Sequence, residues 1–355
     1  MPTLAVLFSA VGPTAPDATA SAPEGSAPPT PVPVSPQGGV LLSRADNERV
    51  AHLVATALRE RGHAVHVLGV WAGVPVERLR NVDAVVNLLE GLEGDSSREA
   101  EATEALQRAG IPFSGNAADT LGRCQRKEVC RRLLLEAGVP VPAGTVLHAV
   151  PMEWPAGVPA PVIVKPAHED ASEGIDARAV ARDLAGLQAA VRRVVVEMGQ
   201  PALVEQFIDG REITASLLGS PPQVLPLGEI DFSTLPAGRP RIVSYAAKWC
   251  PESDEYQCTP SVGARLDATV TARIETIARR AAAALKLRDV ARLDLRVDAR
   301  GGAWVIDVNP NCDLAPDAGF AKAAARAGLS YGEMLDRVVA RAVAARPDRR
   351  AAASA

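Results

Sequence analysis

The sequence lacks the features that mark several large classes of protein. Its net charge is −4, from 38 basic and 42 acidic residues, so it has neither the cationic excess of a nucleic-acid-binding protein nor a polybasic membrane anchor. Its five cysteines are odd in number and include no Cys-x-x-Cys pair, which argues against a disulfide scaffold. No apolar run approaches the roughly 18 residues that span a bilayer, and the run at 4–10 is too short for a signal peptide. We therefore expect a cytoplasmic protein with free thiols that binds neither nucleic acid nor membrane.

What is present is the composition of a globular protein with more than one packed unit. Hydrophobic residues make up 47% and charged residues 23% of the 355 residues. A chain of this length exceeds one ordinary core and suits two or three packed units.

The N-terminal third alternates between short apolar strands and amphipathic helices. Strands are predicted at 4–8, 64–70 and 83–89, and helices at 45–62 and 98–110. This alternation predicts a doubly wound parallel sheet, in which ligands bind at the carboxyl ends of the strands.

The carboxyl ends of the first and third strands fall near Phe8–Ser9 and Glu90–Gly91. The first strand is followed by the segment 12–39, which is dense in Pro, Ala, Ser and Gly. Such a composition cannot bury enough apolar surface to order itself, so we expect a mobile loop. It is either an inert insertion or a lid over a site at the end of the first strand.

Two strands near the C-terminus, separated by the turn 299–302, place polar side chains on one face of a predicted hairpin. Asp307 and Asn309 share a face because side chains alternate along a strand, and antiparallel pairing can bring Asp294 to the same face. Two carboxylates and a carboxamide suit Mg²⁺, which keeps coordination positions for phosphate oxygens. The alternative is a solvent-facing hairpin, but the apolar surroundings of Asp307 weaken it.

Three lysines could supply the positive charge that a metal–phosphate site needs. Lys165 ends an apolar strand and is followed by a proline, so its ammonium can enter a cleft as a point charge for phosphate. Lys127 and Lys248 are further candidates. Taken singly, each lysine could instead be a solvated surface charge.

Glu205 and Glu212 flank the dipeptide Asp209–Gly210. This dipeptide predicts a tight turn between two strands, at 202–208 and 211–219. A carboxylate near such a turn can bind ribose hydroxyls. The alternative is a surface hairpin without a ligand.

Taken together, these motifs resemble the ATP-grasp superfamily, and specifically its D-alanine–D-alanine ligase-like branch. The resemblance spans about residues 85–338, and the motifs occur in the family order at family-like separations. Each motif alone is modest, whereas five in order are specific. They lie at 162–175, 203–219, 245–249, 292–298 and 305–316.

The resemblance implies an α/β protein with a three-domain ATP-grasp architecture. We expect an N-terminal parallel α/β domain at 1–117 that carries the Pro-rich insert 12–39. A small central lid domain at 118–207 and a C-terminal antiparallel-sheet α+β domain at 208–345 should follow, with a disordered tail at 346–355. A homodimer is a further expectation from the family.

The implied activity is that of an ATP-dependent carboxylate–amine ligase acting on amino acids or short peptides. ATP phosphorylates a carboxylate to an acyl phosphate, and an amine then displaces phosphate to form an amide. Positioning and charge neutralisation supply most of the catalysis of such a transfer. The resemblance assigns Lys127 and Lys165 to the ATP phosphates, Glu205 and Glu212 to the nucleoside, Gln206, Phe207 and Ile208 to adenine, Lys248 to the γ-phosphate, Arg292 to the oxyanion, and Asp294, Asp307 and Asn309 to two Mg²⁺ ions.

The sequence also departs from the family, and the departures concern the substrates. The glycine- and serine-rich lid is replaced by 170–174, which retains Ser172 and adds Glu173. A tyrosine usual in the closing loop is Trp249. The glutamate that holds the first substrate's amine is missing, so Glu48 is only a doubtful substitute.

The residues that bind the second substrate's carboxylate in the family are also missing, and Asp313 and Asp317 stand in that segment. An acid about 4 Å from a carboxylate would repel it by about 1 kcal/mol in water and by more in a cleft. We therefore hypothesise that the substrate is not D-alanine, and that one substrate presents an amino or cationic group toward Glu173, Asp313 or Asp317. The alternative is that these acids form structural pairs with arginines.

Two other functions stay open at this point. One is a catalytically idle ATP-binding regulatory protein of the same fold, although the full set of lysines and metal ligands argues against it. The other is a true D-alanine–D-alanine ligase of cell-wall synthesis, which differs only in substrate.

Overall fold

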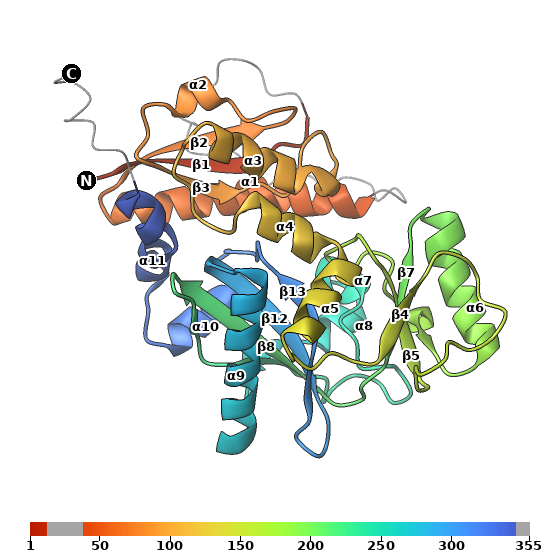
Figure 1. Ribbon diagram of the computed structural model, residues 1–355. Helices are drawn as coiled ribbons and strands as arrows, with labels where there is room; N and C mark the ends of the chain where they lie inside the picture. The colour runs from red at the N-terminus through yellow and green to blue at the C-terminus, as the bar shows by residue number, and fades with distance from the viewer. Residues whose placement is uncertain (13–37, 346–355) are drawn as a thin grey trace.

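The computed structural model describes residues 1–12 and 38–345 of the chain, with side chains in the second range described from residue 46. Apart from its ends, the predicted insert 12–39 lies outside the described residues, as does the predicted tail 346–355. The described chain forms three sheets with helices packed around them (Figure 1). Among its helices, none combines the length and the apolar character needed to cross a bilayer.

The N-terminal sheet is parallel, as the strand–helix alternation predicts. Its order is β2-β1-β3, and both pairs of neighbouring strands run parallel. Residues 4–9 are all buried, which fits a strand covered on both faces. The elements are β1 (Thr3–Ser9), α1 (Gly38–Glu60), β2 (Ala64–Val70), α2 (Val76–Leu79), β3 (Ala84–Leu88), the 3-10 helix η1 (Ser96–Arg98) and α3 (Glu99–Arg108).

The carboxyl ends of β1 and β3 are joined by buried polar side chains. Asn47 on α1 accepts a hydrogen bond from the Ser9 backbone N–H and donates one to the Leu88 carbonyl, both at 2.9 Å. The Ser9 hydroxyl donates to the Gly91 carbonyl at 2.9 Å. The two strand ends at which we expect a ligand therefore lie side by side.

The central part of the chain forms an antiparallel sheet with a core of its own. The strand order is β4-β7-β5-β6, and buried Val162, Leu187 and Val204 belong to this core alone. In Figure 1 the sheet lies on the right beside α6. The elements are β4 (Gly144–Leu147), β5 (Val162–Pro166), the 3-10 helix η2 (Ala177–Ala179), β6 (Val180–Ala181), α6 (Leu184–Arg192), the π-helix η3 (Arg193–Glu197) and β7 (Ala202–Gln206).

The third sheet has one polar face and one apolar face. Its order is β11-β10-β8-β12-β13, with β9 paired to β8. Helix α9 packs Ile274 against Ile213 and Leu293 on the apolar face. The elements are β8 (Arg211–Gly219), β9 (Gln223–Val224), β10 (Gly228–Ile230), α7 (Tyr245–Trp249), α8 (Asp254–Gln257), β11 (Ser261–Gly263), α9 (Ala268–Leu285), β12 (Asp289–Val297), β13 (Ala303–Asn309), α10 (Gly319–Arg326) and α11 (Tyr331–Ala344).

The predicted tight turn at Asp209–Gly210 is wrong in one respect, because the strands on its two sides do not pair. β7 pairs with β4 and β5, whereas β8 pairs with β9, β10 and β12. The dipeptide is therefore the crossing between two sheets. A Cβ on Gly210 would stand 2.2 Å from the Val297 carbonyl oxygen, so the close approach of β12 requires glycine there. Local turn chemistry marks the change of direction, and tertiary packing chooses the partner strand.

The N-terminal and C-terminal units share one continuous hydrophobic core. Val6 and Leu58 of the first unit lie in the same cluster as Val290 and Met334 of the last. Helix α11, at the left of Figure 1, contacts β3 of the first sheet and both β8 and β12 of the third. The central sheet is thus the only one of the three whose described core is separate.

A buried carboxylate also joins the N-terminal and C-terminal units at their contact region, the seam. Asp289, only 1% exposed, accepts hydrogen bonds from Arg341 on α11 at 2.8 Å and from the Gly115 backbone N–H at 2.9 Å. Arg341 also donates to the Phe113 carbonyl at 2.6 Å. Residues far apart in the sequence therefore fix the two outer units together.

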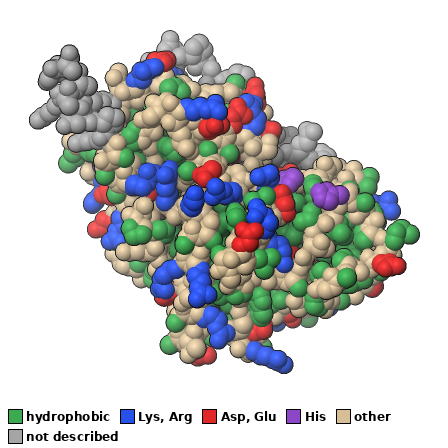
Figure 2. Space-filling view, in the orientation of Figure 1, with side chains coloured by type: hydrophobic (Ala, Val, Ile, Leu, Met, Phe, Trp, Pro, Cys, Tyr) green, Lys and Arg blue, Asp and Glu red, His purple; other side chains and the backbone are tan. Residues whose placement is uncertain are grey.

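Two helices connect the N-terminal unit to the central sheet, and they pack against the C-terminal one. These are α4 (Ala118–Gln125) and α5 (Lys127–Glu136). Their buried Cys124 and Leu134 belong to the same core as α9. Lys and Arg side chains, with acids beside them, cover this middle region of the face in Figure 2.

Candidate active site

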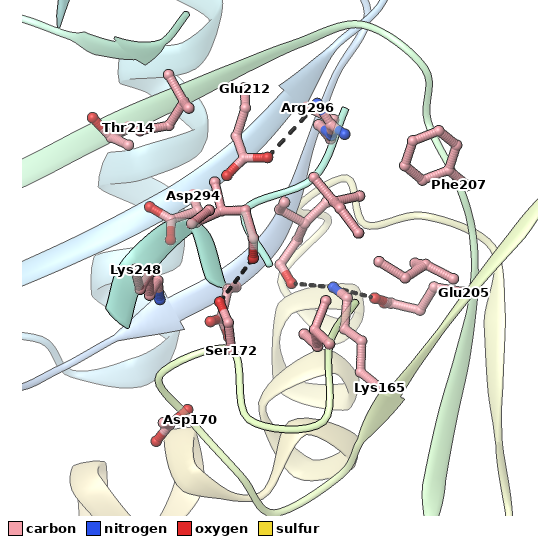
Figure 3. A pocket seen from close by; sticks show the side chains of 18 of the residues that line it. Lys165, Asp170, Ser172, Glu205, Phe207, Glu212, Thr214, Lys248, Asp294 and Arg296 are labelled. Carbon is pink, nitrogen blue, oxygen red and sulfur yellow. Dashed lines mark hydrogen bonds and ion pairs between the residues drawn. The ribbon is translucent and has the colours of Figure 1, made fainter. Parts of the chain in front are cut away.

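A cavity of about 250 Å³ lies between the central and C-terminal sheets (Figure 3). Side chains from both sheets, from α5, from α7 and from the loop after β5 line it. The sequence-predicted residues that line the cavity are Lys127, Lys165, Ser172, Glu173, Glu205, Gln206, Phe207, Ile208, Glu212, Lys248, Arg292, Asp294 and Asp307. Outside this lining lie Asn309, Trp249, Glu48, Asp313 and Asp317.

At one end of the cavity a buried carboxylate holds two cations. The Lys165 ammonium donates to Glu205 and to the Ile306 carbonyl, each at 3.0 Å, and Arg131 donates to the second Glu205 oxygen at 3.0 Å. Lys165 and Glu205 are 6% and 4% exposed. A buried pair of this kind is stable only when its remaining hydrogen bonds are satisfied, as they are here. Glu205 therefore orients Lys165 within the cavity.

The same end offers an apolar surface and a free backbone donor. Phe207 and Ile208 are 8% exposed and line the cavity with Ile163. The backbone N–H groups of Gln206 and Phe207 donate to Ala143 and Pro161 carbonyls at 2.7 and 2.8 Å. No such bond is found for the Ile208 N–H within the described residues. An apolar slot beside an unpaired N–H suits the edge of a purine ring.

Two carboxylates face each other across the closing hairpin. Asp294 on β12 stands directly opposite Asp307 on β13, which confirms the predicted pairing. Arg292 binds both Asp294 oxygens at 2.8 Å, and the Lys127 ammonium donates to Asp307 at 3.2 Å. The two acids are thus held on one face of the sheet beside compensating cations.

Asp307 is ionised despite its position in the cavity. Burial acts to raise the pKa of Asp307, but the ammonium groups of Lys127, Lys165 and Lys248 outweigh it and hold that pKa at about 2. The Asp294 carboxylate in turn raises the pKa of Arg292, against the effect of burial. Both groups keep their charges at neutral pH.

Lys127 and Lys248 respond to different surroundings. Burial would lower the pKa of Lys127, but Asp307 and Asp170 raise it, and Asp170 accepts from its ammonium at 3.1 Å. The pKa of Lys248 is lowered by burial and by the nearby Arg292 guanidinium. Lys248 on α7 therefore lies against the cavity without an acid strong enough to compensate its burial.

Glu212 lies on the sheet face close to Arg296, which is 3.6 Å away (Figure 3). Burial raises the pKa of Glu212, and the Arg296 charge only partly offsets this. Glu212 keeps an oxygen available to a hydroxyl donor in the cavity. Arg296 also stacks on Phe207, with its guanidinium carbon 5.3 Å from the ring centroid.

Two loops are clasped together over the cavity. The Ser172 hydroxyl donates to the Val243 carbonyl at 2.9 Å, and the Trp249 indole N–H donates to the Ala171 carbonyl at 3.0 Å. Ala171 and Ser172 have φ of 56° and 62°, a left-handed conformation that costs non-glycine residues about 1 kcal/mol each. The loop between β5 and β6 thus covers the lysine–carboxylate set in a strained form.

The tentative substrate residues divide into two groups. Glu173 lines the cavity, and burial followed by the nearby Glu169 carboxylate raises the pKa of Glu173. Asp313 and Asp317 are exposed and lie close to Arg49 on α1, which suits the structural alternative. Glu48 is exposed and does not line the cavity.

Sequence reasoning missed the contact between Glu99 and Asn311, which joins the N-terminal unit to the loop after β13. Asn311 donates to Glu99 at 2.6 Å and to the Leu89 carbonyl at 2.8 Å, so it ties the loop after β13 to the N-terminal unit. Burial, assisted by Asp170 and Glu90, raises the pKa of Glu99 to about 8. A glutamate at the start of a helix gives no sequence signal for such a contact.

The donor set fits Mg²⁺. Two carboxylates in register offer hard oxygen ligands, and Mg²⁺ commonly takes one or two carboxylates together with phosphate oxygens. Within the described chain there is no cluster of three or more His, Cys, Asp or Glu residues, as would be needed for a cage built from such side chains alone. The side-chain carboxamide oxygen of Asn309 (Oδ1) accepts from the Asn311 backbone N–H at 2.9 Å, so a metal there would compete with a loop hydrogen bond.

Comparisons with known proteins show the family to which the chain is similar. The family model described as "D-ala D-ala ligase C-terminus" matches residues 148–340. A D-alanine–D-alanine ligase of Gloeobacter violaceus is 31% identical over 85% of this chain and 98% of its own. An uncharacterised protein, y4sG, of Sinorhizobium fredii is 30% identical over 82% of this chain and 86% of its own.

A solved structure shares the fold. The D-alanine–D-alanine ligase of Bacillus anthracis complexed with ATP superposes with a TM-score of 0.68 at 18% identity, covering 96% of this chain and 98% of that one. At this identity the likeness concerns the fold, which is the predicted α/β ATP-grasp architecture.

Proposed function

The chain belongs to the D-alanine–D-alanine ligase family of ADP-forming ATP-grasp enzymes, and from this premise we propose that it joins a carboxylate to an amine with substrates other than D-alanine. The observation that carries the proposal is the cavity in which Asp294 and Asp307 stand in register beside Lys127, Lys165 and Lys248. A protein that only bound nucleotide would need no such complete set.

In this proposal the chain's own residues divide the work along the cavity. Lys165, oriented by Glu205, and Lys127 bind phosphate oxygens, while Phe207 and the Ile208 N–H hold the base. Glu212 accepts from ribose hydroxyls. Each of these groups is preorganised by a hydrogen bond or by burial, so it need not reorganise during transfer.

Asp294, Asp307 and Asn309 would hold Mg²⁺, for which we propose two ions. Bound there, Mg²⁺ would neutralise the charge of the phosphate oxygens. Lys248 would contact the terminal phosphate from α7. Arg292, held by Asp294, would place its guanidinium beside the oxygen that becomes negative when the amine attacks the acyl phosphate.

We propose that the first substrate presents an amino group toward Glu173. This residue lines the cavity, and within the described chain no hydrogen bond or ion pair joins its carboxylate to an arginine or a lysine. The proposed division into a lid domain at 118–207 and a C-terminal domain at 208–345 places Glu173 on the lid. Closing the lid would therefore bring Glu173 onto the substrate.

A second candidate is a true D-alanine–D-alanine ligase. The name of the Gloeobacter violaceus relative favours it. The two candidates share every residue of the nucleotide end and differ only in the groups that face the substrates.

The test is Mg²⁺-dependent ADP release measured across a panel of D- and L-amino acids, singly and in pairs. Hydroxylamine in the same assay should trap the acyl phosphate as a hydroxamate, which identifies the donor carboxylate. Strong activity with D-alanine alone would overturn the substrate proposal and establish the second candidate. ADP release without amino acid dependence, and no hydroxamate, would overturn the ligase proposal itself.

A further inference from the structure

The cavity continues beyond the catalytic set into a region to which none of the predicted site residues belongs. There it is lined by Thr214, Ile230, Thr259, Ser261 and Gly319. These residues come from β8, β10, the segment before β11, β11 itself and the first turn of α10. The region adjoins Asp294, because Thr214 is its neighbour in register on β8.

Gly319 is not required by the backbone or by close packing. Its φ is not positive, and a Cβ built on it meets only the Ser261 hydroxyl oxygen, at 3.7 Å, which is ordinary contact. A side chain could therefore be accommodated at this position. The absence of a side chain on Gly319 leaves a space open between α10 and β11, at the end of the cavity.

Two further glycines, Gly228 and Gly263, lie on the sheet beside this space. Gly228 pairs with Thr214 on one side and with Gly263 on the other, so the three residues form a row across the sheet. A Cβ on Gly228 would stand 2.4 Å from the Thr214 hydroxyl oxygen and 3.2 Å from an Arg326 nitrogen. A Cβ on Gly263 would stand 3.2 Å from the Arg326 Cδ. The glycines thus make room for the arginine side chain.

Arg326 lies beside this space at the far end of α10, where it is exposed and is not one of the residues that line the cavity. It follows Gly319 by seven residues, or two turns, so both lie on the same face of the helix, and its side chain leans toward the helix N-terminus. Its guanidinium and the Thr214 hydroxyl both lie on the side of the sheet toward which a Gly228 side chain would point. Within the described residues no hydrogen bond or ion pair of Arg326 is found. The guanidinium is therefore available to an anion.

We propose that this space is a subsite for the side chain of the amine substrate, and that it takes an anionic side chain such as the ω-carboxylate of an acidic amino acid. The inference rests on the proposed ligase function. Gly319 provides the volume, the Thr214 and Ser261 hydroxyls provide hydrogen bonds, and Arg326 provides the charge. An alanine methyl group would leave the hydroxyls and the guanidinium without a partner.

The experiment is calorimetric titration of the full-length protein, saturated with Mg²⁺ and adenylyl imidodiphosphate, with aspartate, glutamate and alanine in both configurations. The wild type should bind at least one acidic amino acid about 10-fold or more tightly than alanine of the same configuration, which is the strength of one charge-assisted hydrogen bond. Arg326→Gln should remove that preference and leave alanine binding unchanged. Lys322→Gln removes a positive charge from another exposed position of the same helix. This variant is the matched control and should keep the preference.

Gly319→Val should fill the space and abolish binding of the acidic amino acid, with an unchanged thermal melt showing that the fold is intact. Equal affinities for acidic amino acids and alanine, no detectable binding of acidic amino acids, or a preference that survives Arg326→Gln would each overturn the subsite. Acidic amino acids that bind as expected, but give no ADP release when paired with any amino acid of the panel, would support the subsite and refute the ligase proposal. ADP release together with tighter binding of alanine than of acidic amino acids would support the ligase proposal and refute the subsite.

Discussion

The two ends of the cavity are built on different physical principles. At the nucleotide end the charges are compensated within the protein, as in Lys165–Glu205–Arg131 and Lys127–Asp307. At the acceptor end the groups are hydroxyls, glycines and an arginine with no partner in the described chain. In our proposal the first end is preorganised for the ATP polyphosphate, whereas the second leaves space and charge for a substrate to complete.

The ends also differ in how the chain assembles them. The nucleotide end comes from strands of two sheets that cross at a single point. The acceptor end comes from β8, β10, β11 and α10, all in the C-terminal unit. The seam that joins this unit to the N-terminal one is a separate region, held by contacts of α11 and α3. Substitutions at the seam and at the nucleotide end should therefore have separable effects.

The largest expected effect is at the seam. Arg341→Ala would leave the Asp289 carboxylate buried without its cation, and loss of one partner from a buried pair costs about 3–5 kcal/mol. We expect the free energy of unfolding from urea titration to fall by that amount, which appears as a lower midpoint at an unchanged m value. Arg337→Ala, an exposed change on the same helix, should cost less than about 0.5 kcal/mol. A loss below about 1 kcal/mol in Arg341→Ala would mean that the Gly115 N–H suffices to hold Asp289.

At the nucleotide end, Asp307→Asn should lower kcat by roughly 10²–10³-fold while the protein stays folded. The substitution removes a charge that three ammonium groups stabilise. ADP release measured against Mg²⁺ concentration should show a weaker metal dependence. Asp254→Asn, an exposed acid on α8, is the control and should retain activity. Wild-type kcat in Asp307→Asn would remove Asp307 from the metal site.

Glu99 provides a pH-dependent test of the seam. Its pKa rises from about 4.3 in the unfolded chain to about 8 in the folded protein, so its contribution to stability is complete below about pH 4 and lost as pH rises toward 8. Glu99→Gln should therefore be more stable than the wild type at pH 8, by on the order of 1–2 kcal/mol, and similar to it at pH 5. Glu104→Gln on the same helix should show no such difference. If the free energy of unfolding changed with pH in the same way in the wild type and in Glu99→Gln, the raised pKa of Glu99 would be contradicted.

The smallest expected effect concerns the hydrogen bond between Trp249 and Ala171, which joins two loops over the cavity. Trp249→Phe removes the hydrogen bond to Ala171, worth about 0.5–1.5 kcal/mol, so the affinity for a non-hydrolysable ATP analogue should fall about 3- to 10-fold. Trp154→Phe removes a comparable indole bond, to Val158, outside the cavity lining. It should leave nucleotide affinity unchanged. Equal affinities of the two variants for the ATP analogue would show that the Trp249–Ala171 hydrogen bond does not hold the lid closed.

The local sequence pattern predicted the fold class and many of the residues that line the cavity. Alternation within β12 and β13 was enough to place Asp294 and Asp307 on one face, because strand periodicity is a local property. It was not enough for the partner of β8, since a turn dipeptide specifies a reversal and says nothing about which sheet receives the next strand. The places of Asn309, Asp313 and Asp317 outside the cavity lining also depend on loop packing.

By itself, the sequence determined the parallel N-terminal sheet, the hairpin with its carboxylates and membership in the ligase family. Each of these follows from side-chain periodicity or from short motifs whose chemistry is contained within a few residues. Only the tertiary structure decided that Glu99 meets Asn311, that Asp289 is held by Arg341, and that Arg326 lies over Gly228 and Gly263. The physical reason is that these contacts join segments that only the packed core brings together, so no local pattern carries them.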